Sequence, residues 1–188
     1  ELWVWLRLKL IADIGFVGLP NSGKSTLLSV LSNAKAKVAN YPFTTLKPQL
    51  GLLRFEQDDL IIADLPGLIS GASEGVGLGL RFLAHIERCS ALAHLCDLSV
   101  EKDEEIIENY RIIRNEIENY GTLVSKKKEI IILTKSDLVC KNKIKKRSDI
   151  LKKYSNSDVT IISSHKKDGI NKLKSIFSEI LDEKITTY

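Results

Sequence analysis

Hydrophobic residues fall into short apolar runs that alternate with longer amphipathic segments. The apolar runs predict six β-strands, at residues 12–18, 49–55, 60–64, 91–97, 129–134 and 159–162. The amphipathic segments predict five helices, at residues 24–32, 78–88, 102–120, 144–154 and 169–182. Within 102–120, one helical face carries Ile106, Tyr110, Ile113 and Ile117. This alternation predicts a three-layer α/β fold with a mostly parallel six-stranded sheet and helices on both faces.

A glycine-rich loop follows the first predicted strand. Residues 18–25 read GLPNSGKS and fit the phosphate-loop pattern of Gly, four residues, Gly-Lys and Ser or Thr. Between a strand and a helix, the N–H groups of such a loop converge on an anion; an ordinary turn is the alternative. We expect Lys24 to contact the β- and γ-phosphates and Ser25 to bind Mg²⁺. The expected phosphate contacts are Gly18, Leu19, Pro20, Asn21, Ser22, Gly23, Lys24, Ser25 and Thr26.

Asp64 ends the strand predicted at 60–64 and begins the sequence Asp-Leu-Pro-Gly. An acid at a strand end can reach the hydration shell of Mg²⁺, and the N–H of Gly67 can approach a γ-phosphate. Turns are often rich in Asp and Gly, so this pattern alone is weak. Its place after a phosphate loop favours a second nucleotide-binding motif.

The strand predicted at 129–134 leads into Thr134-Lys135-Ser136-Asp137. The Asp137 carboxylate can accept hydrogen bonds from N1–H and the exocyclic amine of guanine, a donor pair that adenine lacks. We expect the stem of Lys135 to lie along the base. Thr134 stands where the usual motif has Asn, so we expect weaker base binding with guanine selectivity retained.

Ser163, Ser164 and His165 follow the last predicted strand. A backbone N–H there would contact O6 of guanine. The motif is weak by itself, and an ordinary polar loop is the alternative. Its position as the fourth element in order favours a role in base binding.

Residues 40–46 lie between the phosphate loop and Asp64. We expect a threonine of this segment to close on Mg²⁺ and the γ-phosphate, as the first switch of a nucleotide-dependent protein. The chemistry alone does not decide whether Thr44 or Thr45 is the residue that binds Mg²⁺. Phe43 and Thr44 are further candidate nucleotide contacts.

The stretch 12–97 resembles the G domain of the Obg family of ribosome-associated GTPases. The resemblance is carried by ADIG (12–15), GLPNSGKST (18–26), NYPFTTL (40–46), DLPGLI (64–69), GASEGVGLG (71–79) and RFLAHIERC (81–89). It implies a Ras-like G domain that binds GTP and GDP and hydrolyses GTP slowly, acting as a switch in assembly of the large ribosomal subunit. By the family pattern, Thr45 is a Mg²⁺ ligand beside Ser25 and Asp64.

Leu68 stands where many GTPases have the glutamine that orients the attacking water. Since leucine cannot hydrogen-bond water, we expect slow hydrolysis, assisted by Lys24, Mg²⁺ and backbone donors such as that of Gly67. The glycines at 67, 71, 75, 77 and 79 predict a second switch that orders when GTP binds.

Asn21 is the remaining candidate catalytic residue. Related GTPases with an apolar residue at the Leu68 position hold a potassium ion at this point of the loop. Our hypothesis is that K⁺, ligated in part by Asn21, supplies positive charge in place of an arginine finger. The alternative is that Asn21 only stabilises the loop.

The composition bears on the extent of the domain and on the compartment in which it is expected. The chain has 188 residues and no methionine, which favours a piece of a longer protein, with residues 1–11 as a linker from a missing domain and 12–188 as the G domain. Arg7, Lys9 and Asp13 interrupt the apolar N-terminal stretch, so no membrane span or signal peptide is expected. The three cysteines form no CxxC pair, which favours buried or incidental thiols in a reducing, cytoplasmic compartment. The three histidines form no metal constellation, so we expect structural roles for His85 and His94. We also expect the G domain to be monomeric.

Charge is unevenly distributed along the chain. Residues 126–153 contain eleven bases and three acids, Glu129, Asp137 and Asp149. A solvated face is one interpretation of this run, and a docking surface for ribosomal RNA is the other.

Two other functions stay open. A P-loop ATPase or nucleotide kinase would fit the phosphate loop, but Asp137 disfavours the first and the lack of an Arg-rich lid the second. A sensor of guanine nucleotides, including guanosine tetraphosphate, would use the same loop with incidental hydrolysis.

Overall fold

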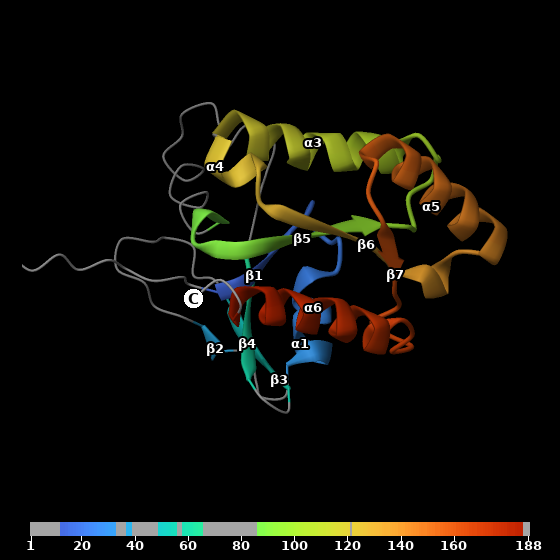
Figure 1. Cartoon of the computed structure of the whole chain (residues 1–188). Coiled ribbons are helices and arrows are strands. Elements are labelled where there is room, and N and C mark those ends of the chain that lie inside the picture. Colours follow the sequence, from blue (N-terminus) through green and yellow to red (C-terminus); the bar gives the residue numbers. More distant parts are fainter. Residues whose placement is uncertain are drawn as a thin grey trace, which may run out of the picture.

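The computed structural model of the chain describes residues 12–32, 37–38, 49–55, 58–65, 86–120 and 122–185. Within these residues one sheet has the strand order β2-β3-β4-β1-β5-β6-β7 (Figure 1). The strands are β1 Ala12–Val17, β2 Lys37–Val38, β3 Gln49–Arg54, β4 Asp59–Asp64, β5 Cys89–Asp97, β6 Lys128–Thr134 and β7 Val159–Ile161. The six predicted strands are all present, and the two-residue β2 extends one edge.

The central pairs of the sheet are parallel. β1 lies between β4 and β5, and β6 lies between β5 and β7, with parallel pairing throughout. Toward one edge the pairing is antiparallel: β3 pairs in that way with β4, and β2 with β3. All six residues of β1 are buried, as expected for a strand covered on both faces. The predicted mostly parallel α/β sheet is confirmed.

Helices cover both faces of the sheet, as predicted. α1 (Lys24–Leu31) and α6 (Ile170–Ile185) lie on one face, and α3 (Glu105–Tyr120), α4 (Thr122–Ser125) and α5 (Lys141–Ser155) lie on the other (Figure 1). The predicted helix at 78–88 lies mostly outside the described residues, although 86–87 are helical. None of the described helices is long and apolar enough to cross a bilayer.

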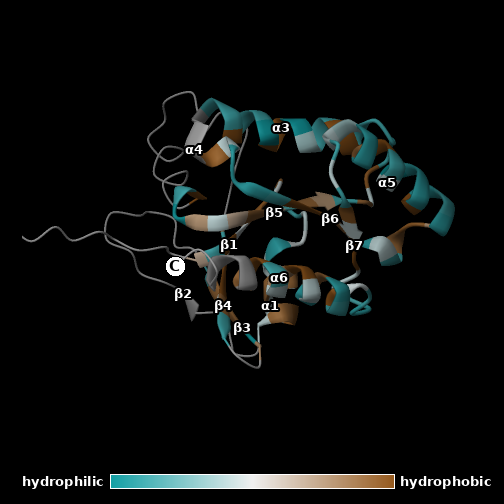
Figure 2. Cartoon of the chain, viewed as in Figure 1, coloured by the Kyte–Doolittle hydropathy of each residue, from teal (hydrophilic) through white to brown (hydrophobic). Residues whose placement is uncertain are grey.

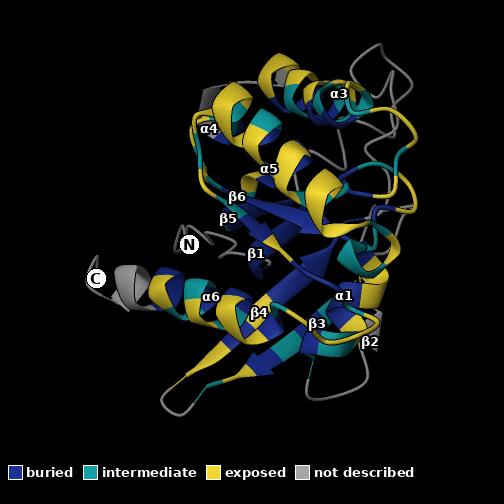
Figure 3. Ribbon diagram, turned by 90° about the vertical axis from the view of Figure 1, so that its right-hand side faces the viewer, coloured by how far each residue is buried: buried dark blue, intermediate teal, exposed yellow. Residues whose placement is uncertain are grey.

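Two apolar layers hold the helices to the sheet. On the face of α1 and α6, the rings of Phe16 and Phe177 pack with centroids 6.4 Å apart. On the opposite face, the four residues predicted to share one side of α3 are all buried: Ile106, Tyr110, Ile113 and Ile117. Figure 2 shows the corresponding polar outer surfaces of these helices, and Figure 3 shows the buried strands between them.

Candidate nucleotide-binding site

The phosphate loop connects β1 to α1 at the carboxyl edge of the parallel strands. The Nζ of Lys24 donates hydrogen bonds to the carbonyl oxygens of Gly18 and Leu19, each at 2.9 Å. Burial lowers the pKa of Lys24, and the nearby charge of Asp64 partly offsets this effect. Backbone acceptors therefore hold the buried ammonium group against the phosphate loop, the part of the chain expected to bind phosphate oxygens.

Two glycines give the loop its shape. A Cβ on Gly18 would lie 2.6 Å from the carbonyl oxygen of Leu95, so a side chain there would collide with β5. Gly23 caps α1 with a φ of 97°, in the left-handed region that favours glycine. Asn21 also has a positive φ, of 64°, and is exposed at the tip of the loop. Thr26 is exposed in the first turn of α1.

Ser25 and Asp64 meet at the end of β4. The Ser25 hydroxyl donates to Oδ2 of Asp64 at 2.5 Å. Asp64 is buried, and its Oδ1 has no hydrogen-bond partner among the described residues. A hydroxyl and a carboxylate with a spare buried oxygen fit Mg²⁺, which binds one or two protein oxygens together with water and phosphate. These residues would therefore suit the predicted metal.

Asp137 lies in a short 3₁₀-helix, Ser136–Leu138, directly after β6. Ser163 donates from its Oγ to Oδ1 of Asp137 at 2.6 Å and accepts a hydrogen bond from the N–H of Lys166 at 3.0 Å. The hydrogen bond from Ser163, with weaker help from the charge of His165, lowers the pKa of Asp137. The loop after β7 thus keeps Asp137 ionised, as an acceptor of base N–H groups must be.

Thr134 and Lys135, the first two residues of the third motif, make contacts to different parts of the structure. Thr134 is buried and points back to the phosphate loop, where its Oγ1 lies 2.8 Å from the carbonyl oxygen of Ser22. Lys135 has a φ of 57°, and its Nζ pairs with Oδ2 of Asp97 at 2.6 Å. The phosphate loop and the base-binding loop are therefore joined through β6.

Asp97 was not among the predicted site residues. It ends β5, and its Oδ1 also accepts hydrogen bonds from the N–H and hydroxyl of Ser99. The signal in the sequence was an acid at a strand end followed two residues later by serine, a common turn pattern. What distinguishes Asp97 is its register opposite Thr134, which places it beside Lys135.

The remaining predicted residues either follow Ser163 or lie outside the described residues. Ser164 is half-buried and His165 exposed, in the turn that follows Ser163. The first switch (40–46), Leu68, the glycines at 67–79 and His85 lie outside the described residues. The same holds for the candidate contacts Phe43, Thr44, Thr45 and Gly67 and for the linker at 1–11.

His94 lies in a polar cluster inside the protein, away from the loops. Its Nδ1 is 2.9 Å from Oε1 of Glu129, and its ring stacks on Tyr110 with centroids 4.8 Å apart. Tyr110 and Arg114 also donate to Oε2 of Glu129. These contacts join β5, β6 and α3, which is consistent with the structural role expected for His94.

Comparison with known proteins agrees with this geometry. The family model described as "50S ribosome-binding GTPase" matches residues 13–135. GTPase Obg of Rickettsia prowazekii is 46% identical over 181 residues, which cover 96% of this chain and 54% of that protein. GTPase Obg of Acidiphilium cryptum is 49% identical over 172 residues, covering 91% and 51%. The chain thus spans about half the length of the curated relatives it matches.

Solved structures support the fold. The G domain of the T. maritima FeoB iron transporter has a TM-score of 0.66 at 22% identity, covering 90% of this chain and 98% of that one. A mutation variant of SsGBP has a TM-score of 0.76 at 21% identity, covering 94% and 57%. The sequence resemblance to Obg proteins is confirmed at 46% and 49% identity. With the family model matching about two thirds of its length, the chain belongs to the 50S ribosome-binding GTPase family.

Proposed function

We propose that this chain binds GTP and hydrolyses it slowly to GDP and phosphate, as the switch of a protein that acts in assembly of the large ribosomal subunit. The observation that carries the proposal is the meeting of three predicted motifs at one edge of the sheet. Lys24 lies in the loop after β1, Asp64 ends β4 and contacts Ser25, and Asp137 follows β6. Ligands of open α/β sheets bind at this edge.

Guanine selectivity is assigned to Asp137. A carboxylate held in its ionised form accepts both N1–H and the exocyclic amine of guanine, and adenine would leave it unpaired. Its hydrogen bond from Ser163 supports this role. Lys135, aligned by its ion pair with Asp97, is proposed to lie along the base, and the loop Ser163–His165 to contact O6.

Ser25 and Asp64 are proposed to hold Mg²⁺ together with Thr45. Bound there, the ion would neutralise charge on the β- and γ-phosphates and so favour phosphoryl transfer. Lys24 is proposed to stabilise the same charge with its ammonium group. With Leu68 in place of a glutamine, no side chain at that position orients the attacking water, which supports slow turnover.

The finer points of the proposal follow the same reasoning. We assign residues 12–188 to a monomeric G domain, and we propose that it is located in the cytoplasm. The exposed Asn21 at the loop tip is proposed to help ligate K⁺ beside the phosphates. The ribosomal partner is proposed from the family to which the chain belongs.

Release of phosphate from GTP and from ATP tests the proposal. We expect slow, Mg²⁺-dependent release from GTP, none above background from ATP, and faster release when purified large ribosomal subunits are added. Lys24→Ala should abolish the GTP signal. Tight guanine-nucleotide binding with no release under any condition would instead favour the sensor, and equal release from ATP would contradict the assignment of Asp137.

A further inference from the structure

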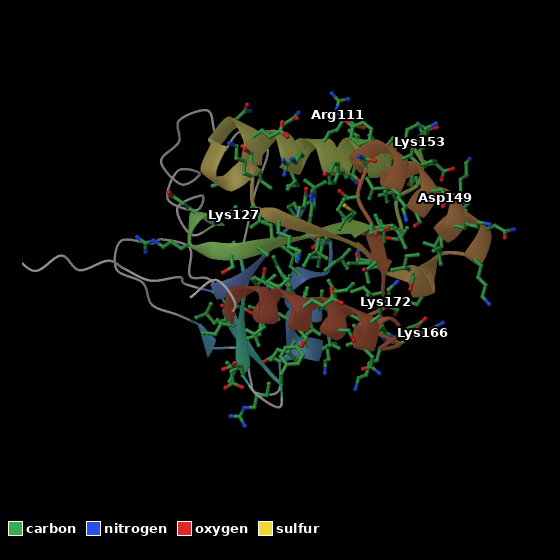
Figure 4. The ribbon with its side chains drawn as sticks, viewed as in Figure 1. Arg111, Lys127, Asp149, Lys153, Lys166 and Lys172 are labelled. Carbon is green, nitrogen blue, oxygen red and sulfur yellow. The ribbon has the colours of Figure 1, made fainter. Side chains whose placement is uncertain are left out.

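α5 carries a strong excess of positive charge. Its fifteen residues include seven bases and a single acid, Asp149. The bases are Lys141, Lys143, Lys145, Lys146, Arg147, Lys152 and Lys153. The loop and helix that follow β7 add Lys166, Lys167 and Lys172, all exposed. Figure 4 shows Lys153, Lys166 and Lys172 toward one end of the molecule, whereas Lys127 lies toward the other.

Ion pairs divide these bases into two groups. Lys146 and Arg147 pair with the two oxygens of Asp103, each at 2.7 Å, and Lys152 pairs with Asp158. The remaining exposed lysines have no ion pair with an acid in the part of the chain that the structure describes. We call this set the lysine face: Lys141, Lys143, Lys145, Lys153, Lys166, Lys167 and Lys172.

Arg147 fixes the orientation of the lysine face. It is only 2% exposed, and its guanidinium donates to the carbonyl oxygens of Leu98, Val100 and Glu101 as well as to Asp103. These contacts fasten α5 to the segment that follows β5. The lysines of α5 therefore project from a helix whose inner side is locked, so the charge pattern is preorganised for a partner.

The lysine face adjoins the base-binding loop. The N–H of Lys166 donates to Ser163 Oγ, and that hydroxyl donates to Asp137. The backbone of Lys166 is therefore two hydrogen bonds away from the carboxylate assigned to guanine.

We propose that the lysine face is a docking surface for the phosphate backbone of RNA. The proposal rests on the proposed function, in which the partner is a ribosomal particle. Lysines are point charges that neutralise phosphates without selecting bases, so this surface would recognise RNA through its backbone. The acids of α3, such as Glu105 and Glu108, lie on the helix packed beside α5 and would bound the contact on that side.

The chemistry of α5 favours RNA over a lipid surface. A helix that lies on a membrane presents apolar residues to the bilayer beside its basic ones. In α5 the aliphatic residues Ile144, Ile150 and Leu151 pack inward against the core, and the lysines remain outside. Tyr154 on α5 and Leu138 before it are exposed, but α5 offers an anionic membrane no exposed aliphatic residue beside its charge.

Binding of a labelled RNA hairpin at several salt concentrations tests the proposal. The variant combines Lys141→Gln, Lys143→Gln and Lys145→Gln, which keep good helix formers in place. The matched control, with Lys102→Gln, Arg111→Gln and Lys126→Gln, removes three charges from exposed positions outside the lysine face. The logarithmic slope of affinity against salt changes by about 0.7 to 0.9 per phosphate contact. We expect the α5 variant to reduce the magnitude of that slope by about 2 and to weaken RNA binding about tenfold or more. The control variant should change both quantities much less.

Three results would overturn the proposal: unchanged RNA binding by the α5 variant, equal losses in both variants, or loss of binding to phosphatidylglycerol vesicles with RNA binding intact. Guanine-nucleotide affinity is measured on the same proteins and should stay at the wild-type value in both variants. If the proposed function itself is wrong, guanine nucleotides will fail to bind even the wild-type chain, whatever the RNA result. The two failures are therefore distinguishable.

Discussion

The hydroxyl of Thr134 donates a hydrogen bond to the carbonyl oxygen of Ser22 at 2.8 Å, across 112 positions of sequence. The same hydroxyl oxygen lies 3.3 Å from the carbonyl oxygen of Cys96. Thr134 is therefore a link between the loop that holds phosphates and the loop that selects the base. Thr134, which stands where the usual motif has Asn, is buried in a contact that holds two halves of the site together.

Removing that hydroxyl should weaken nucleotide binding. Thr134→Val keeps the shape but leaves the Ser22 carbonyl without its partner, at a cost of about 1–3 kcal/mol for a buried group. We expect GDP affinity to fall about tenfold, by titration with a fluorescent analogue. Thr134→Ser, which keeps the hydroxyl, should bind like the wild type. Equal affinity for Thr134→Val and the wild type would show that the contact does not support binding.

Asp64 should control the Mg²⁺ requirement. Asp64→Asn removes the negative charge of the buried carboxylate, so we expect half-maximal GTP turnover to need about 10–100 times more Mg²⁺. The measurement is phosphate release against Mg²⁺ concentration. Asp58→Asn, at an exposed aspartate between β3 and β4, is the control and should follow the wild-type curve. An unchanged Mg²⁺ curve for Asp64→Asn would exclude Asp64 from the metal site.

Stability should fall on the alkaline side because of His94. Burial disfavours its charged form, but interactions with Cys96 and Glu129 outweigh burial and raise the pKa of His94 to about 9 from 6.5. A group whose pKa is raised by folding contributes its full stability below pH 6.5 and loses it as pH rises through 9. We expect urea unfolding to show this decline between those values, and His94→Gln to lack it. Parallel pH profiles for the two proteins would rule out the contribution of His94.

The dependence on monovalent cations tests Asn21. If K⁺ supplies positive charge near the phosphates, GTP turnover in KCl should exceed that in NaCl by about tenfold or more. Asn21→Ala should remove most of this difference while GDP affinity stays close to the wild-type value. Equal rates of GTP turnover in the two salts would contradict the hypothesis and leave Asn21 as a loop-stabilising residue.

Local patterns predicted the sheet and the position of the motifs because apolar runs and glycine spacing act over a few residues. α5 begins at Lys141 rather than at 144, because its first three residues are polar and add nothing to the apolar periodicity. The ion pair of Asp97 with Lys135 depends on the register of β5 against β6, where Asp97 lies opposite Thr134. Such contacts follow from strand pairing over long distances in sequence, which periodicity does not reveal.

The selection of guanine by Asp137 is the central claim, and exchanging its carboxylate for an amide tests it most directly. In Asp137→Asn the amide N–H can donate to the 2-carbonyl oxygen of xanthine, and the side chain can no longer accept hydrogen bonds from both donors of guanine. We predict that GTP affinity falls at least about a hundredfold and that xanthosine triphosphate becomes the preferred ligand, with Asp149→Asn as an unaffected control. An Asp137→Asn protein that still prefers GTP over xanthosine triphosphate would contradict the account.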